Sequence, residues 1–326
     1  MKDDPRLIKR ILCPTDFSIF SDRALRHAIA LARQFDARLN VVHVIPPLYP
    51  TSGASYYFPA PILAGPELRQ GVQEELRRFV APADEARVPV EAQIRDGQPW
   101  REIQALAEEL PADLVVMGTH GTGGFERLFL GSVAERVLRR LRCPVLTVCH
   151  EEGQTWEAPG LVRRVLCATD LAESSPPTIA FALALAARYE AAVTLLHVIE
   201  AASDTPFAPL LGDLDHARFQ AELVRIAREK MAKAVPLAAR LPGFDERVSV
   251  GRASEEILKL ATEQRVDLIV MGTQGRGPLG RMLFGSTAHQ VVRHATCPVL
   301  TVRPTTTRPR AVDTEAALEA AATPRG

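Results

Sequence analysis

The strongest constraint on the fold is an internal duplication. Residues of the same type recur 154 positions apart through both halves of the 326-residue chain, as Cys13 and Cys167 do. A period of this length corresponds to a whole domain rather than to a solenoid unit. The other matching pairs are Asp16 and Asp170, Ser21 and Ser175, His43 and His197, Gly97 and Gly251, Ile103 and Ile257, Asp113 and Asp267, Gly118 and Gly272, Gly121 and Gly275, Gly131 and Gly285, and Cys143 and Cys297.

Two domains with one fold are therefore predicted. We expect the first to span residues 1–150 and the second to span residues 161–304, with a short polar linker at 151–160. Residues 305–326 are rich in Pro, Thr and Ala, a composition that predicts a mostly disordered tail.

Composition narrows the class of protein. Apolar residues make up 47% of the chain, and 39 basic residues balance 39 acidic ones, which argues against a nucleic-acid binder. No apolar run approaches the roughly 18 residues that span a membrane, and the charged start is not a signal peptide. A cytoplasmic location is expected.

The five cysteines form no CxxC pair or zinc-type cluster, so we expect reduced, mostly buried thiols and no metal site made of protein side chains.

Apolar strands alternate with helical periodicity in the first half. Ser21 is expected to cap the first helix, and His43 and His197 are expected to pack in the core. The Pro-, Gly- and Tyr-rich loop 46–66 is a lid, a contact surface or a loose loop. Strands are predicted near 11–13, 39–45, 90–94, 114–117 and 145–148, and helices near 67–80 and 99–110 and from Ser132. This α/β alternation predicts a Rossmann-like parallel sheet with helices on both faces.

A glycine-rich segment lies between the fourth predicted strand and the helix that follows. It reads MGTHGTGGFERLFLGS at 117–132 and returns as MGTQGRGPLGRMLFGS at 271–286, with Gly-x2-Gly-x9-Gly-Ser in both copies. Glycine lets a ligand approach the backbone, and a helix start offers N–H groups to phosphate. Ser132 and Glu135 predict a capping box, in which the second copy has His289 in place of the glutamate. A tight connection without a ligand is the alternative.

Asp16 follows the first strand directly. If the first and fourth strands are neighbours where the winding direction reverses, Asp16 and the glycine loop face each other across the crevice in which such sheets bind ligands.

The glycine spacing, the aspartate after strand one and a closing CPVLTV strand together resemble the universal stress protein family, in its ATP-binding, tandem form. The resemblance covers both halves. It implies two adenine nucleotide alpha hydrolase-like domains, each with a five-stranded parallel sheet of order 3-2-1-4-5. It also implies ATP as ligand, with any Mg²⁺ held mainly by the phosphates.

The resemblance also assigns roles to residues. On the base and ribose side it places Pro14, Thr15, Asp16, Val42, Met117 and Gly118, and in the second half Ala168, Thr169, Asp170, Leu196, Met271 and Gly272. On the loop and phosphate side it places His120, Gly121, Gly131, Ser132 and Val133, and in the second half Gln274, Gly275, Gly285, Ser286 and Thr287. Arg127 and Arg281 recur four residues before Gly-Ser and are candidates for phosphate contact.

Three functions remain open from the sequence: a nucleotide-dependent stress-response sensor or switch, a slow ATPase or phosphotransferase, and a nucleotide-free scaffold. No GKS or GKT follows the glycines, and the first loop supplies only Glu126 as a carboxylate, with His120 as a candidate base. Binding is therefore favoured over turnover, and no catalytic residue is assigned. The expected partners are ATP or a related adenine nucleotide, without nucleic acid or membrane. The apolar strand-five edges at 145–148 and 299–302 are expected to pair, within one chain or in a homodimer.

Overall fold

The computed structural model describes residues 7–47, 65–121, 130–148, 162–173, 175–200, 213–235, 241–273 and 284–303. Contacts divide the chain into two compact units, one of residues 8–160 and one that contains residues 161–326. Among the described residues, no helix combines the length and the apolar character that crossing a bilayer requires.

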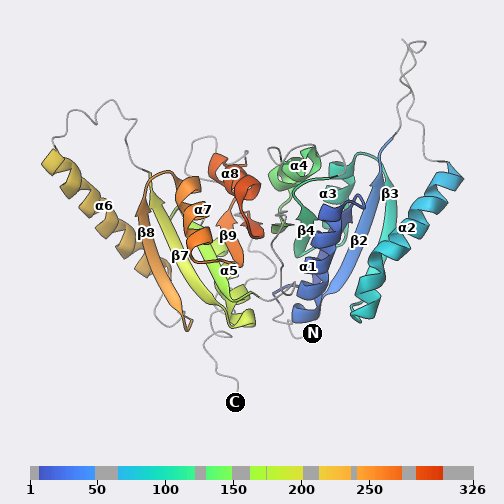
Figure 1. The fold of residues 1–326 in the computed structure, drawn as a ribbon, viewed down its shortest axis with the longest axis horizontal. Coiled ribbons are helices and arrows are strands. Elements are labelled where there is room, and N and C mark those ends of the chain that lie inside the picture. The colour runs from blue at the N-terminus through green and yellow to red at the C-terminus, as the bar shows by residue number, and fades with distance from the viewer. Residues whose placement is uncertain are drawn as a thin grey trace, which may run out of the picture. The chain divides into compact units, whose positions relative to one another are not determined.

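Strands and helices alternate through the first unit (Figure 1). Its elements are β1 (Arg10–Thr15), α1 (Ile19–Phe35), β2 (Arg38–Ile45), α2 (Pro66–Glu85), β3 (Val90–Asp96), α3 (Pro99–Glu109), β4 (Leu114–Gly118), α4 (Ser132–Arg140) and β5 (Val145–Val148). The strands are parallel in the order β3-β2-β1-β4-β5, which confirms the predicted topology.

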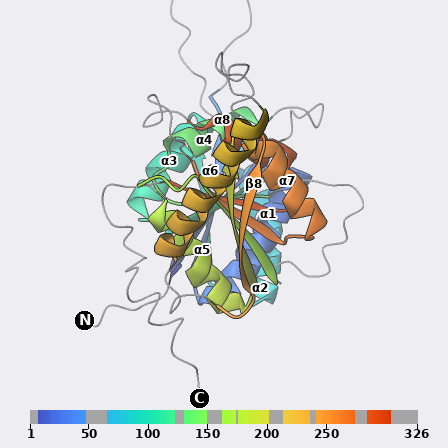
Figure 2. The same cartoon turned by 90° about the vertical axis from the view of Figure 1, so that its left-hand side faces the viewer.

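The second unit repeats this arrangement. Its elements are β6 (Arg164–Thr169), α5 (Pro176–Tyr189), β7 (Ala192–Ile199), α6 (Asp213–Ala234), β8 (Phe244–Val250), α7 (Ala253–Glu263), β9 (Leu268–Gly272), α8 (Ser286–His294) and β10 (Val299–Val302). The order is β8-β7-β6-β9-β10, again parallel. Figure 2 shows α5 and α7 on opposite sides of this sheet.

Both faces of the central strands are buried, as expected for a sheet with helices on each side. All five residues of β4 are buried, and α1 buries one face that includes Leu25 and Ala28. The free thiols of Cys13, Cys167 and Cys297 are buried as predicted, whereas Cys143 is only half-buried.

One strand is longer than the sequence predicted. A strand was expected near 11–13, but β1 continues through Pro14 to Thr15. β1 aligns with β4 at two positions only, whereas β6 aligns with β9 at four, the last of them Ala168 with Met271. Proline has no N–H for a ladder bond, which explains why the pairing stops earlier in the first half.

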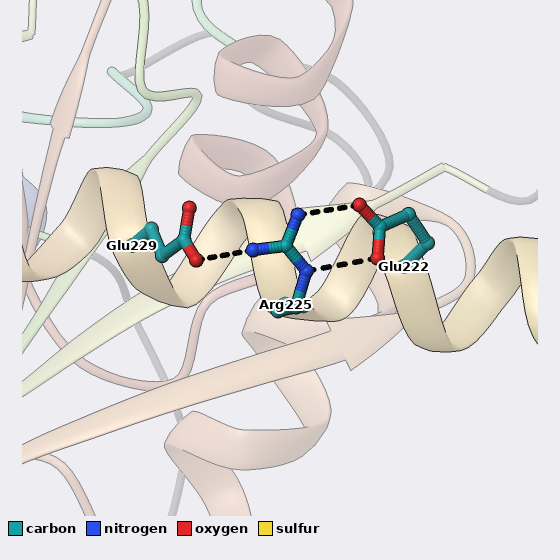
Figure 3. Close-up of polar contacts among 3 residues, drawn as sticks. All are labelled: Glu222, Arg225 and Glu229. Carbon is teal, nitrogen blue, oxygen red and sulfur yellow. Dashed lines mark hydrogen bonds and ion pairs between the residues drawn. The ribbon is translucent and has the colours of Figure 1, made fainter.

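Helix α6 carries a local ion network on its exposed face (Figure 3). Arg225 donates from Nε and Nη2 to the Glu222 carboxylate, at 2.8 and 2.5 Å, and from Nη1 to Glu229. This hydrogen bonding lowers the pKa of Glu222. Pairs spaced by three and four residues stabilise a helix locally, and each contributes little because solvent screens it.

Candidate nucleotide site

The two predicted ligand loops meet at one edge of the first sheet. β1 and β4 are adjacent and parallel, so Asp16 and Gly121 both follow the carboxyl ends of neighbouring strands. A Cβ added to Gly121 would lie 2.4 Å from Asp16 Oδ2. A residue with a side chain cannot occupy this position while the carboxylate stays in place. Asp16 and the start of the glycine loop therefore lie next to each other, as the hypothesis of facing loops predicted.

A tight turn holds Asp16. Oδ1 of the carboxylate accepts hydrogen bonds from the amide of Ser18, at 3.1 Å, and from its hydroxyl, at 2.6 Å. Phe17 has a φ of 63°, and its amide donates to Thr15 Oγ1 at 2.9 Å. A non-glycine residue in the left-handed region is strained, and such strain persists only where the surroundings enforce it.

The second half repeats the turn. Leu171 has a φ of 55°, and its amide donates to Thr169 Oγ1 at 3.0 Å. Oδ1 of Asp170 accepts from the Ala172 amide at 3.0 Å and from the Ser175 hydroxyl at 2.6 Å. Both halves thus place a carboxylate at the same point by the same backbone conformation.

The two helix starts that follow the glycine loops have a common geometry. The amide of Gly131 donates to the Thr119 carbonyl at 2.8 Å, and that of Gly285 donates to the Thr273 carbonyl at 2.8 Å. The amides of the first three residues of a helix have no carbonyl four residues back, so they point out of its end. The outward-pointing amides therefore begin at Ser132 and Ser286, while those of Gly131 and Gly285 already have acceptors.

The predicted capping box is wrong. Gly131 occupies the N-cap position, and within the described part of the chain no side chain caps the helix. Ser132 is instead the first helical residue, and Glu135 accepts from Arg139 at 2.7 Å. The predicted cap at Ser21 is also wrong, because Ser18 caps α1 and accepts from the Ser21 amide at 3.3 Å.

Several predicted contact residues are buried in the sheet. Val42 and Leu196 have no exposed surface, and Met117 and Met271 are each 5% exposed. Pro14, Thr15, Gly118 and Ala168 are buried as well, whereas Thr169 and Gly272 are half-buried. The buried side chains among these residues are covered by the protein itself.

Two phenylalanines that were not predicted as site residues, Phe17 and Phe20, contact histidines close to the predicted site of the first half. The ring of Phe20 lies 5.4 Å from that of His120, whose Nδ1 is 2.9 Å from Thr119 Oγ1. Phe17 stacks on His43 at 4.4 Å. The only feature of the sequence that could have placed Phe17 and Phe20 near the site is that they follow Asp16 closely along the chain.

The two histidines predicted to pack in the core differ in burial. His197 is 7% exposed, whereas His43 is only half-buried. Each places Nδ1 close to a carbonyl, that of Thr15 at 3.0 Å and that of Thr169 at 2.9 Å. Burial lowers the pKa of His43, which favours its neutral form.

Part of the predicted site lies outside the described residues. This part includes Glu126, Arg127, Gln274, Gly275 and Arg281, and the same is true of Cys149, the linker 151–160, the tail and most of loop 46–66. Within the described ranges, His, Cys, Asp and Glu side chains form no group of three that could hold a metal ion.

The fold and the aspartate turns define a class of protein: a duplicated, doubly wound α/β protein with an aspartate after the first strand of each half and, in the first half, Gly121 beside that aspartate. The model of the universal stress protein family matches residues 7–148 and 162–303. The chain therefore belongs to the universal stress protein family.

Relatives of both one-domain and two-domain length match the chain. A universal stress protein of Mycobacterium tuberculosis is 30% identical over 320 residues, which cover 92% of this chain and 98% of the relative. One from Methanocaldococcus jannaschii is 39% identical over 153 residues, covering 45% of this chain and 86% of the relative. The solved structure of a universal stress protein from Archaeoglobus fulgidus matches with a TM-score of 0.63 at 21% identity, covering 93% and 99% of the two chains, and this match supports the fold.

Proposed function

We propose that each half binds an adenine nucleotide, with ATP as the expected ligand, and that the chain acts as a nucleotide-dependent switch in the stress response. One observation carries the proposal. In the first half the Asp16 carboxylate occupies the space that a side chain at Gly121 would need, and it does so at the crevice edge of the sheet. The repeated aspartate turn in the second half extends the argument to Asp170.

The helix-start amides suit the phosphates of a nucleotide, and the aspartates suit its ribose or base. The first amides of α4, at Ser132 and Val133, and those of α8, at Ser286 and Thr287, would hold phosphate oxygens, since a helix start favours anions. Arg127 and Arg281 are further candidates for phosphate contact. An aspartate accepts hydrogen bonds from a ribose hydroxyl or a base amino group. Mg²⁺ would be held mainly by the phosphates of the nucleotide.

Switching follows from the place of the ligand. A nucleotide that engages the loop before α4 would bias the conformation of that loop, and hence its affinity for a partner protein or a second copy. The pairing of the β5 and β10 edges, within one chain or between two, and a cytoplasmic location belong to this proposal.

Calorimetric titration of the full chain with ATP tests the proposal. We expect about two nucleotides per chain and none for the Asp16→Ala, Asp170→Ala double variant, because each aspartate contacts one ligand. The control is Asp245→Ala, which removes an exposed carboxylate that pairs with Arg247 on β8. Absence of ATP binding to the unmodified chain would refute the proposal and favour a scaffold. Steady phosphate release that the double variant loses would favour an ATPase.

A further inference from the structure

We propose that a buried serine hydroxyl positions each nucleotide-contacting aspartate, and that the two halves supply it from different places in the sequence. Ser18 has this role in the first half and Ser175 in the second. The inference rests on the proposed function, because it concerns the orientation of the carboxylate that would contact the nucleotide.

In the first half the hydroxyl comes from the residue two positions after the aspartate. Ser18 is 9% exposed, and its Oγ donates to Asp16 Oδ1 at 2.6 Å. The Ser21 hydroxyl makes a different contact, since it donates to the Ser18 carbonyl at 2.9 Å and accepts from Thr15 Oγ1 at 3.0 Å. Ser21 therefore supports the turn, while Ser18 holds the carboxylate.

In the second half the hydroxyl comes from the other of these two positions. The counterpart of Ser18 is Ala172, which has no hydroxyl, and the counterpart of Ser21 is Ser175. Ser175 is 8% exposed, and its Oγ donates to Asp170 Oδ1 at 2.6 Å, the distance found for Ser18. The same bond to the same carboxylate oxygen has been kept although its donor moved three residues along the chain. This retention points to a requirement on the carboxylate rather than on either serine.

The hydroxyl adds a second donor to the carboxylate oxygen that a backbone amide already holds, that of Ser18 at 3.1 Å or that of Ala172 at 3.0 Å. An anchored Oδ1 directs Oδ2 to a fixed place, which in the first half is beside Gly121. Because both hydroxyls are buried, water cannot easily take over when one is removed. Loss of the hydroxyl should therefore weaken contact with the nucleoside end of the ligand and leave the amides at the helix start unchanged.

Ser175→Ala is the cleaner test. Ser175 occupies the N-cap position of α5, yet within the described residues its side chain makes no capping bond. The substitution therefore removes the bond to Asp170 without removing a cap. In a full-length Asp16→Ala background, where only the second site remains, we expect ATP affinity to fall roughly ten-fold. Affinity for inorganic tripolyphosphate, which lacks the nucleoside, should not change.

Two variants distinguish positioning from a general structural role. Adding Ala172→Ser to Ser175→Ala gives the second half the arrangement of the first and should restore ATP affinity. Ser175→Thr keeps the hydroxyl and should therefore retain the ATP affinity of its parent. In the Asp170→Ala background, Ser18→Ala should weaken ATP binding more than Ser21→Ala does, because the Ser21 hydroxyl supports the turn without bonding the carboxylate.

The outcomes separate this inference from the proposed function. If the unmodified chain binds no ATP, the proposed function fails and the inference fails with it. If ATP binds but Ser175→Ala binds it as tightly as its parent, the inference alone is overturned. Equal loss of ATP and tripolyphosphate affinity, or no rescue by Ala172→Ser, would also overturn it, because either result indicates a damaged loop.

Discussion

Gly121 is the glycine that lies directly against the Asp16 carboxylate. We predict that Gly121→Ala lowers ATP affinity in the first half at least about ten-fold, because the new Cβ would displace the Asp16 carboxylate. The measurement is ATP titration of the full chain in an Asp170→Ala background.

Gly71→Ala is the matched control for this substitution. Gly71 lies in α2, and among the described atoms none stands within 4 Å of an added Cβ. Alanine there should leave ATP binding unchanged and raise stability by about 0.5–1 kcal/mol, since it favours the helix. Unchanged ATP affinity in Gly121→Ala would show that the contact between the two loops does not define the site.

His27 makes the stability of the first half depend on pH. Burial lowers the pKa of His27 from 6.5 to about 4, so the folded chain keeps this ring neutral where the unfolded chain protonates it. Stability should therefore be fully present above pH 6.5 and should fall as the pH drops toward 4. The loss at pH 5 should be about 2 kcal/mol.

The second half provides the control, because its counterpart of His27 is Phe181, which is 3% exposed. His27→Phe should remove most of the difference between pH 7 and pH 5 in urea unfolding. Trp100 fluorescence in a Trp156→Phe background reports on the first half, since these are the two tryptophans of the chain. An equal pH dependence in both proteins would assign the effect to other groups.

At the scale of elements, one aspartate in each half ties the start of a strand to its neighbour. Oδ2 of Asp113 accepts from the amides of Lys9 and Arg10, at 2.8 and 2.9 Å, next to the start of β1. Asp267 accepts from Arg163 and Arg164, at 2.9 and 2.8 Å, at the start of β6. The duplication has kept this contact because it joins the first strand to the fourth.

We predict that Asp113→Ala destabilises the first unit by about 1–3 kcal/mol, since it leaves two amides without their charged acceptor. Hydrogen exchange at Lys9 and Arg10 should accelerate, and Asp113→Asn should lose less because its carbonyl still accepts. If exchange is the same in Asp113→Ala as in the unmodified chain, the contact does not hold β1 in place.

The helix starts show where local sequence patterns mislead. Ser132 and Glu135 have the spacing of a capping box, but the helix begins one residue earlier than that motif requires. Gly131 donates its amide to Thr119, twelve residues away, and this longer-range bond sets the first turn. Likewise Ser18, rather than Ser21, caps α1, since Ser18 also bonds Asp16. A pattern within one helix contains no information about an acceptor on another element.

For the whole molecule, the residues predicted the fold class, and the resemblance to the family implied the strand order. Five apolar strands separated by helices, with right-handed crossovers, predict a parallel sheet covered on both faces but leave its strand order open. The facing of Asp16 and the glycine loop was a hypothesis that depended on the first and fourth strands being neighbours, which they are. The hydroxyl contact of Ser18 could not be predicted, because the first half has two serines after the aspartate, Ser18 and Ser21, and their spacing does not say which one reaches the carboxylate.

The duplication also makes a prediction about the whole chain. Each half has its own aspartate turn and its own helix start, so the two ligands should bind independently. In hydrogen exchange of the full chain, saturating ATP should protect the amides at 132–134 and 286–288, where phosphate would accept hydrogen bonds. Asp16→Ala should remove protection from 132–134 alone, and Asp170→Ala from 286–288 alone. Asp245→Ala should preserve both, since its carboxylate pairs with Arg247 on β8. Loss of protection in both halves after a single substitution would contradict independent sites and would mean that one ligand depends on the other.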